Sequence, residues 1–198
     1  MKKIAIYGGS FDPPHEGHKL LAKNLADSCG AERVLIIPTA MSPFKNTSGA
    51  ASSQRYEMCR LAFNDPLFEV SDIEINRGGK SYTVDTVNAV KELYPQGDLY
   101  LFMGDDMFLS FNKWYKYEEI ISMCTIVAAC RTEALSELDN MRAFARDVLH
   151  IGEHKVIFCE SVPVEISSTT IRENIKNNCF DYIDGAVAEY IKAEGLYL

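Results

Sequence analysis

Two histidines in a glycine- and proline-rich stretch are the side chains best placed to do chemistry. His15 and His18 end the segment GGSFDPPHEGH (residues 8–18), which follows the apolar run Ile4–Tyr7. A spacing of three residues puts both imidazoles on one face of a helix that we predict to begin near His15. The free N–H groups and the dipole of that first turn favour an anion, so the pair suits a polyphosphate.

Metal binding and simple packing are the alternatives for this stretch. His-x-x-His supplies only two ligands, and Asp12 could add one more for zinc or iron, whereas structural zinc sites use four. The glycines favour phosphate instead, because Gly8 and Gly9 permit close backbone approach directly after a strand. Gly17 is expected to leave room for a ligand against the helix. We therefore predict no metal site built by the protein.

A second anion site is predicted near the other end of the chain. In the segment VEISSTTIR (residues 164–172), Ser167 or Ser168 is a natural N-cap, and Thr169 and Arg172 lie on the first turn. Taken alone, the pattern fits an ordinary capped helix equally well. Paired with the first stretch, it indicates two helix N-termini that hold one triphosphate from two sides.

Strands and helices alternate along the chain and must position these groups. Apolar, β-branched runs predict strands at Lys3–Tyr7, Val34–Ile37, Phe68–Ile75, Leu99–Met103, Thr125–Cys130 and Val156–Cys159, and helical periodicity falls in 53–63, 83–94 and 134–150. The order predicts an α/β fold: Rossmann-like, doubly wound, with a mainly parallel sheet and helices on both faces. Ligands of such sheets bind beyond the carboxyl ends of strands. We expect one domain, 1–198, with a C-terminal helical part over 166–198.

Composition restricts compartment and partners. Of 198 residues, 47% are hydrophobic, enough for a sizeable core, and the net charge of −8 disfavours nonspecific binding to nucleic acid or acidic membranes. Six scattered cysteines without a CxxC pair fit reduced thiols in the cytoplasm. The first residues are typical of a strand rather than a signal peptide, and no apolar run approaches ~18 residues. We expect small-molecule partners, no nucleic acid and no membrane, and leave a homo-oligomer open.

The two phosphate stretches resemble a known superfamily. GGSFDPPHEGH is similar to the ATP-binding motif of nucleotidyltransferases that carry an H-x-G-H element, and residues 166–172 resemble their I-S-S-T-x-I-R element. The sequence of the first stretch is most similar to that of the bacterial nicotinate mononucleotide adenylyltransferases, and the resemblance covers about residues 1–195. The resemblance implies a single reaction, transfer of AMP from ATP to nicotinate mononucleotide, which gives deamido-NAD and pyrophosphate.

Three further stretches resemble the nicotinate branch. Residues 42–45 match a loop in which relatives have a histidine where this chain has Phe44. Residues 77–86 match a G-x-S-Y-T-x-D-T element; a helix capped there by Ser81 or Thr83 would leave N–H groups for a carboxylate. Residues 104–106 and 113–115 match a Gly-x-Asp and a Lys-Trp-Tyr element.

The resemblance implies a role for each matched residue. The catalytic group is His15, His18, Lys45 and Arg172. The ATP group is Gly8, Gly9, Ser10, Phe11, Gly104, Asp106, Ile166, Ser168 and Thr169. The mononucleotide group is Thr83, Trp114 and Tyr115, with the indole stacked on the pyridine ring. Arg131 is added to this group from its position alone, because it ends the predicted strand Thr125–Cys130 at a ligand-facing place; pairing with a nearby acid is the alternative. ATP is the co-substrate, and Mg²⁺ is expected on the phosphates with mostly water ligands.

Other functions stay open from the sequence. The acceptor could be nicotinamide mononucleotide or phosphopantetheine, the protein could be a non-catalytic ATP-binding module, or His15 and His18 could serve a metal-dependent hydrolase. Retention of both histidines, Lys45 and Arg172 argues against a module, because binding alone need not compensate the charge of a transition state.

Overall fold

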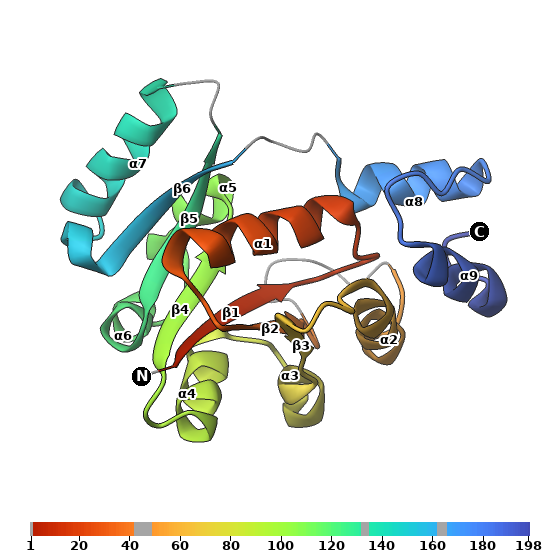
Figure 1. Cartoon of the computed structure of the whole chain (residues 1–198), viewed down its shortest axis with the longest axis horizontal. Coiled ribbons are helices and arrows are strands. Elements are labelled where there is room, and N and C mark those ends of the chain that lie inside the picture. Colours follow the sequence, from red (N-terminus) through yellow and green to blue (C-terminus); the bar gives the residue numbers. More distant parts are fainter. Residues whose placement is uncertain (1, 42–48, 132–134, 162–165) are drawn as a thin grey trace. The chain divides into compact units, whose positions relative to one another are not determined.

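The computed structural model describes residues 2–41, 49–131, 135–161 and 166–198. Six strands form one sheet in the order β3-β2-β1-β4-β5-β6 (Figure 1). The strands are β1 (Lys3–Gly9), β2 (Arg33–Pro38), β3 (Phe68–Val70), β4 (Asp98–Met103), β5 (Thr125–Arg131) and β6 (Val156–Ser161). The pairings of β4 with β1, of β5 with β4 and of β6 with β5 are all parallel. This confirms the predicted doubly wound α/β class.

Helices connect these strands, as parallel pairing requires. They are α1 (Glu16–Cys29), α2 (Ser52–Ala62), α3 (Ile73–Arg77), α4 (Thr83–Leu93), α5 (Asp105–Phe108), α6 (Tyr117–Met123), α7 (Leu135–Asp147), α8 (Ser168–Lys176) and α9 (Gly185–Glu194), with 3₁₀ turns η1 (Phe111–Lys113) and η2 (Glu153–Lys155). None of the described helices is long and apolar enough to cross a membrane.

The chain groups into two compact units. Unit 1 holds Met1–Tyr7, Leu21–Val34 and Tyr82–Pro163, and unit 2 holds Gly8–Leu20, Leu35–Ser81 and Val164–Leu198. The prediction of a single domain stays a prediction.

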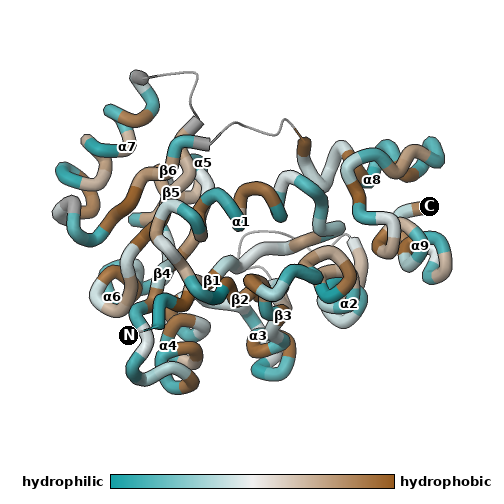
Figure 2. Tube along the Cα trace, viewed as in Figure 1, coloured by the Kyte–Doolittle hydropathy of each residue, from teal (hydrophilic) through white to brown (hydrophobic). Residues whose placement is uncertain are grey.

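The strands of unit 1 contain continuous apolar runs, such as Ile126–Cys130 in β5. Its hydrophobic residues run along β5 and β6 (brown in Figure 2). Val84, Val87 and Val90 recur at three-residue steps on α4 and are all buried, as an amphipathic helix packed on a core requires. α7 contacts β5, and α4 contacts α6. The burial of an apolar stripe on each helix therefore explains how the sequence selects these elements.

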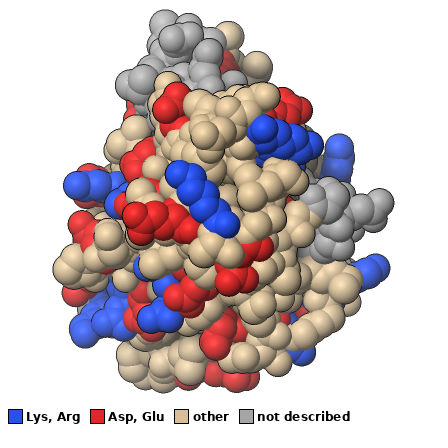
Figure 3. Space-filling model, turned by 90° about the vertical axis from the view of Figure 1, so that its right-hand side faces the viewer, with Lys and Arg blue, Asp and Glu red and all other residues tan. Residues whose placement is uncertain are grey.

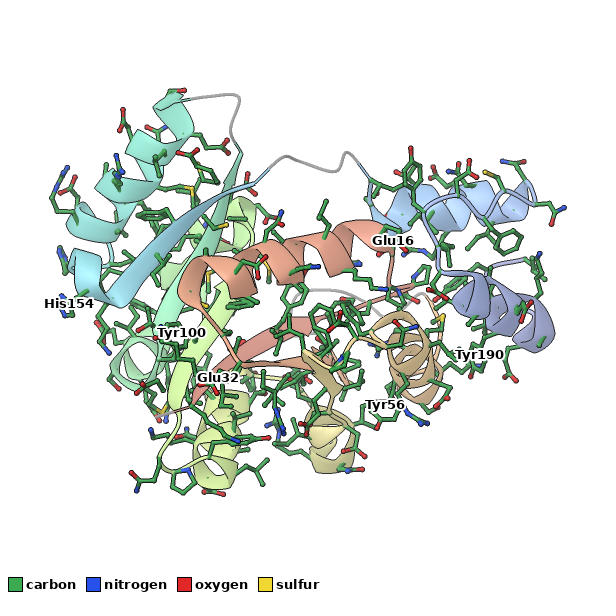
Figure 4. All side chains as sticks on the ribbon, viewed as in Figure 1. Glu16, Glu32, Tyr56, Tyr100, His154 and Tyr190 are labelled. Atoms are coloured by element: carbon green, nitrogen blue, oxygen red, sulfur yellow. The ribbon has the colours of Figure 1, made fainter. Side chains whose placement is uncertain are left out.

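Unit 2 contains residues 8–18, which are called the glycine-rich loop below; Gly8 and Gly9 close β1, and α1 begins at Glu16. Within it α2 contacts α9, and Figure 4 labels Tyr56 on the first helix and Tyr190 on the second. Phe63 packs edge-on against both Phe11 and Phe68, with ring centroids 5.8 and 5.3 Å away. Aromatic packing therefore joins the glycine-rich loop to the end of α2 and the start of β3.

Two predicted elements end well before their expected last residues. The strand expected over Phe68–Ile75 ends at Val70, because the turn-forming pair Ser71-Asp72 leads directly into α3. The helix expected over 134–150 ends at Asp147, and the closing helix ends at Glu194, where Gly195 takes the left-handed conformation common after helices.

The cysteine side chains are free thiols, and charged side chains of both signs lie on the surface. All six cysteines are free, and five of them are buried. On the face drawn in Figure 3, acidic and basic side chains are interspersed. Local exposed pairs include Arg60 with Glu57 at 3.1 Å. Such pairs contribute little to stability, at most about 1 kcal/mol each.

Candidate active site

The loop after β1 is held tightly by its own aromatic residue. Phe11 has a positive φ of 47° and is 1% exposed. Its ring lies over Gly9, where a Cβ atom would come within 2.9 Å of it. Glycine is therefore required at position 9 for close packing, and Phe11 can offer a ligand its backbone but not its ring.

His15 and His18 stack on each other, as their spacing predicts. Their ring centroids are 3.7 Å apart, and Phe11 packs edge-on against His18 at 5.1 Å. The expected room over Gly17 is absent: a Cβ there would lie 3.0 Å from Nδ1 of His15 and 3.3 Å from a methyl carbon of Ile166. The imidazole, rather than a ligand, fills the space that the glycine leaves.

The two imidazoles differ in environment. Burial lowers the pKa of His15 to about 4, so this ring is neutral at pH 7. Among the described residues its Nδ1 has no hydrogen-bond partner. Nδ1 of His18 accepts a hydrogen bond from the backbone N–H of His15 at 3.3 Å, which places the proton of the neutral ring on Nε2. His18 is thereby oriented as an Nε2–H donor, and His15 contributes polarity rather than charge.

The low pKa of His15 predicts an acid-labile fold. The unfolded chain takes up a proton below pH 6.5, whereas the folded chain resists it down to about pH 4. Stability therefore falls as the pH drops through this window, by about 2 kcal/mol between pH 7.5 and 5. Urea unfolding at both pH values measures it. His15→Gln should lose less stability than wild type over this interval, and an equal loss in both would contradict the prediction.

The first turn of α8 binds the backbone of the glycine-rich loop. Ser167 is the N-cap and accepts a hydrogen bond from the N–H of Thr170 at 3.1 Å, which confirms one of the two predicted caps. Ser168 donates its hydroxyl to the carbonyl of Pro13 at 3.0 Å, and Nη1 of Arg172 donates to the carbonyl of Asp12 at 2.6 Å. The two predicted phosphate stretches are thus bonded directly to one another through residue pairs 155 and 160 positions apart.

Arg172 also orients its own helix turn. Its Nη2 donates to Oγ1 of Thr169 at 3.2 Å. Thr169 is exposed, while Ser168 and Arg172 are half-buried. Ser168 and Arg172 therefore fix the loop, whereas the hydroxyl of Thr169 remains accessible to a ligand.

Arg55 is a structural residue that the sequence analysis missed. It is 6% exposed, and it donates to the carbonyls of Ser10 at 2.7 Å and Ala50 at 3.2 Å, and to that of Thr39. Burial lowers its pKa, and the nearby Asp12 carboxylate opposes that shift. One buried guanidinium thus fastens three chain segments. An arginine in an amphipathic helix pattern carries no sequence signal that distinguishes it from a solvated one.

A second group of predicted residues lies in unit 1, at the carboxyl end of β4. Asp106 is exposed on the first turn of α5, and its Oδ1 accepts a hydrogen bond from the N–H of Met107 at 2.8 Å. A Cβ at Gly104 would lie 3.1 Å from the same oxygen. The glycine thus gives the carboxylate its space, at the strand end where parallel sheets bind ligands.

Aromatic rings join the start of α4 to the Lys-Trp-Tyr segment. Tyr82 is the N-cap of α4 and lies against Tyr115, with ring centroids 4.9 Å apart. Trp114 packs edge-on against Phe111 at 5.2 Å and is half-buried. Thr83, the first residue of α4, is therefore brought close to the predicted mononucleotide residues through Tyr82.

The predicted cap of α4 was wrong. Neither Ser81 nor Thr83 caps the helix: the N-cap is Tyr82, without a side-chain hydrogen bond. Ser81 is buried, and its hydroxyl accepts a hydrogen bond from the N–H of Ala40 at 3.1 Å. The hydroxyl oxygen of Ser81, which the local sequence predicts to cap α4, is thus engaged in a tertiary contact instead.

The side chains of two predicted site residues, Lys45 and Arg131, lie outside the described structure. Lys45 lies in the stretch 42–48, which is outside the described residues. Arg131 ends β5 opposite Ser161, and its side chain is also outside the description. Within the described ranges, no group of three or more His, Cys, Asp or Glu residues could hold a metal ion.

The parallel sheet and the paired phosphate motifs define a Rossmann-like nucleotidyltransferase. The sequence matches the cytidylyltransferase-like family over residues 6–174. Bacillus subtilis nicotinate-nucleotide adenylyltransferase is 34% identical over 202 residues, covering 100% of this chain and 99% of its own. A Treponema pallidum relative is 38% identical and covers 98% of both chains. The chain therefore belongs to the cytidylyltransferase-like family, among the nicotinate-nucleotide adenylyltransferases.

A solved structure supports the same fold. Plasmodium falciparum nicotinic acid mononucleotide adenylyltransferase complexed with NaAD matches 100% of this chain and 98% of its own with a TM-score of 0.75 at 19% identity. The predicted family, fold class and enzyme class are thus confirmed.

Proposed function

We propose that the protein transfers AMP from ATP to nicotinate mononucleotide and releases pyrophosphate, with residues 1–198 acting as one transferase domain. The observation that carries the proposal is the direct bonding of α8 to the glycine-rich loop through Ser168 and Arg172. It joins two anion-binding helix turns into one phosphate site. The names of the relatives support the choice of acceptor.

The chemistry requires alignment more than proton transfer. The attacking 5′-phosphate of the mononucleotide is dianionic near neutral pH, since such a group has a second pKa of about 6. No general base is then needed when it attacks the α-phosphorus. Positioning and charge compensation can supply about 7–11 kcal/mol of the barrier.

We assign most of the ATP-binding residues to unit 2, and the geometry of His18 supports this assignment. Nε2–H of His18 is assigned to the α-phosphate and its developing charge, because its other nitrogen is engaged with His15. Lys45 and Arg172 are assigned to the departing pyrophosphate. Neutral His15 joins them as a hydrogen-bond donor. The backbone of Gly8, Gly9, Ser10 and Phe11 is also assigned to ATP, with Ile166, Ser168 and Thr169. Gly104 and Asp106, which belong to unit 1, are assigned to ATP from the resemblance alone.

The mononucleotide group belongs to unit 1. We assign the pyridine ring to Trp114 and Tyr115, and its carboxylate to the N–H groups at the start of α4 beside Thr83. Tyr82 joins this group because its ring lies against Tyr115. Arg131 is assigned to the same substrate from its position at the end of β5.

Mg²⁺ and the cellular setting belong to the proposal as family expectations. The described residues provide no cage of metal ligands, so the ion would rest on phosphate oxygens and water, and no step is assigned to it. The free thiols support a reducing cytoplasmic setting, with small molecules as partners and the oligomeric state open.

Comparing acceptors tests the proposed function. We expect kcat/KM to be about tenfold or more higher with nicotinate than with nicotinamide mononucleotide, because helix N–H groups bind a carboxylate more strongly than a neutral amide. Pyrophosphate release from ATP with each acceptor measures it. A preference for nicotinamide mononucleotide or for phosphopantetheine would show that nicotinate mononucleotide is not the acceptor. ATP binding without turnover would indicate a module, and acceptor-independent, metal-dependent ATP cleavage would indicate a hydrolase.

A further inference from the structure

The carboxylate of Asp12 is half-buried and hydrogen-bonded within the protein. Its Oδ1 accepts hydrogen bonds from the hydroxyl of Tyr197 and from the N–H of Ala50, the latter at 3.0 Å. The backbone approaches its other oxygen so closely that a Cβ at Gly49 would lie 1.7 Å from Oδ2. The geometry gives Asp12 an internal role in place of the metal-ligand role considered from the sequence.

Tyr197 reaches this carboxylate from the last residues of the chain. It follows the end of α9, and its positive φ of 63° directs the backbone out of a regular helix. Burial, and the carboxylate beside it, raise the pKa of the phenol, so Tyr197 stays protonated and remains a donor. A C-terminal residue thus bonds to the loop 185 positions earlier.

The same short loop is held from its other sides as well. Arg172 bonds to the carbonyl of Asp12, Ser168 to that of Pro13 and Arg55 to that of Ser10. The side chain of Asp12 accepts hydrogen bonds both from the segment at residues 49–50 and from Tyr197. Removal of Tyr197's hydroxyl would loosen that attachment and leave the carbonyl contacts in place.

We propose that Tyr197 is a positioning residue for ATP, acting through Asp12 to hold the loop at residues 8–18 in its phosphate-binding conformation. The proposal rests on the proposed use of ATP. A loop that is competent for only part of the time binds its ligand more weakly in proportion to that fraction. Because the residues assigned to the mononucleotide belong to other segments, the loss should fall on one substrate.

Tyr197→Phe tests this role with the ring kept in place. We expect the KM for ATP and its calorimetric dissociation constant to rise about tenfold, with the KM for nicotinate mononucleotide within about twofold of wild type. Tyr182→Phe is the matched control, since that side chain is 56% exposed and should leave both constants unchanged. A merely structural role would lower the melting temperature and the active fraction without separating the two KM values.

A double-mutant cycle tests whether the effect passes through Asp12. We expect Asp12→Ala to weaken ATP binding by itself and to abolish any further effect of Tyr197→Phe, whereas additive effects would overturn the coupling. Should Asp12→Ala not fold, the KM values of Tyr197→Phe still decide the proposal, and an unchanged ATP constant in folded protein overturns it. Wild type that binds ATP but does not use the mononucleotide would instead reject the proposed acceptor, and the binding measurement would still report on Tyr197.

Discussion

Replacement of His18 by alanine is expected to lower kcat by about 10²–10³-fold while the KM for nicotinate mononucleotide changes little. The structure fixes the neutral ring as an Nε2–H donor through the hydrogen bond that Nδ1 accepts from His15. A donor aimed at charge that develops only in the transition state contributes to turnover rather than to substrate binding. Pyrophosphate release under saturating ATP and mononucleotide measures the effect.

Two isosteric variants separate the donor from the ring. Glutamine places an amide N–H near Nε2, whereas asparagine reproduces only the acceptor near Nδ1. His18→Gln should therefore retain more activity than His18→Asn. His154→Ala is the control, because that side chain is exposed on η2 and outside the proposed site (Figure 4). Turnover of His18→Ala near the wild-type rate would remove His18 from the catalytic group.

Arg55→Met is expected to have the largest effect on stability, a loss of about 3–5 kcal/mol in the free energy of unfolding. The guanidinium is buried and binds the carbonyls of Ser10, Thr39 and Ala50. Methionine fills similar space but leaves these carbonyls without their donor and Asp12 without its nearby positive charge. Urea unfolding of both proteins at pH 7.5 measures the difference.

A matched arginine on the same helix gives the reference. Arg60 lies on α2 and pairs with Glu57 at 3.1 Å, with 57% of its side chain exposed. Arg60→Met should change stability by less than about 1 kcal/mol, since exposed ion pairs contribute little. Equal losses from the two variants would show that Arg55 does not fasten the loop in solution.

Arg55 and Arg60 differ in burial, and the sequence does not predict this difference. Both occupy one helix of eleven residues, and nothing in the local pattern marks Arg55 as buried. The histidine pair is different, since its three-residue spacing on a helix already places the two rings together. Spacing within an element is therefore readable from sequence, whereas burial of a long polar side chain depends on segments far along the chain.

The capping errors have the same origin. Ser167 was foreseen as one of two caps because its oxygen reaches the N–H of Thr170 within one helix turn. The same rule predicts Ser81 as a cap of α4, but its hydroxyl instead accepts a hydrogen bond from the N–H of Ala40. Where a distant backbone donor competes with the local one, the local rule has no information about the outcome.

The order of apolar runs and glycine-rich turns was sufficient to predict the alternating α/β fold, the helix that begins directly after His15 and carries His18, and the capped start of α8. These features depend on interactions within a few residues and on hydrophobic periodicity. Only the tertiary structure decided that Arg172 and Ser168 bind the loop backbone and that Tyr197 bonds to Asp12. Contacts between segments more than a hundred residues apart follow from how the whole chain packs, and a local pattern does not contain them.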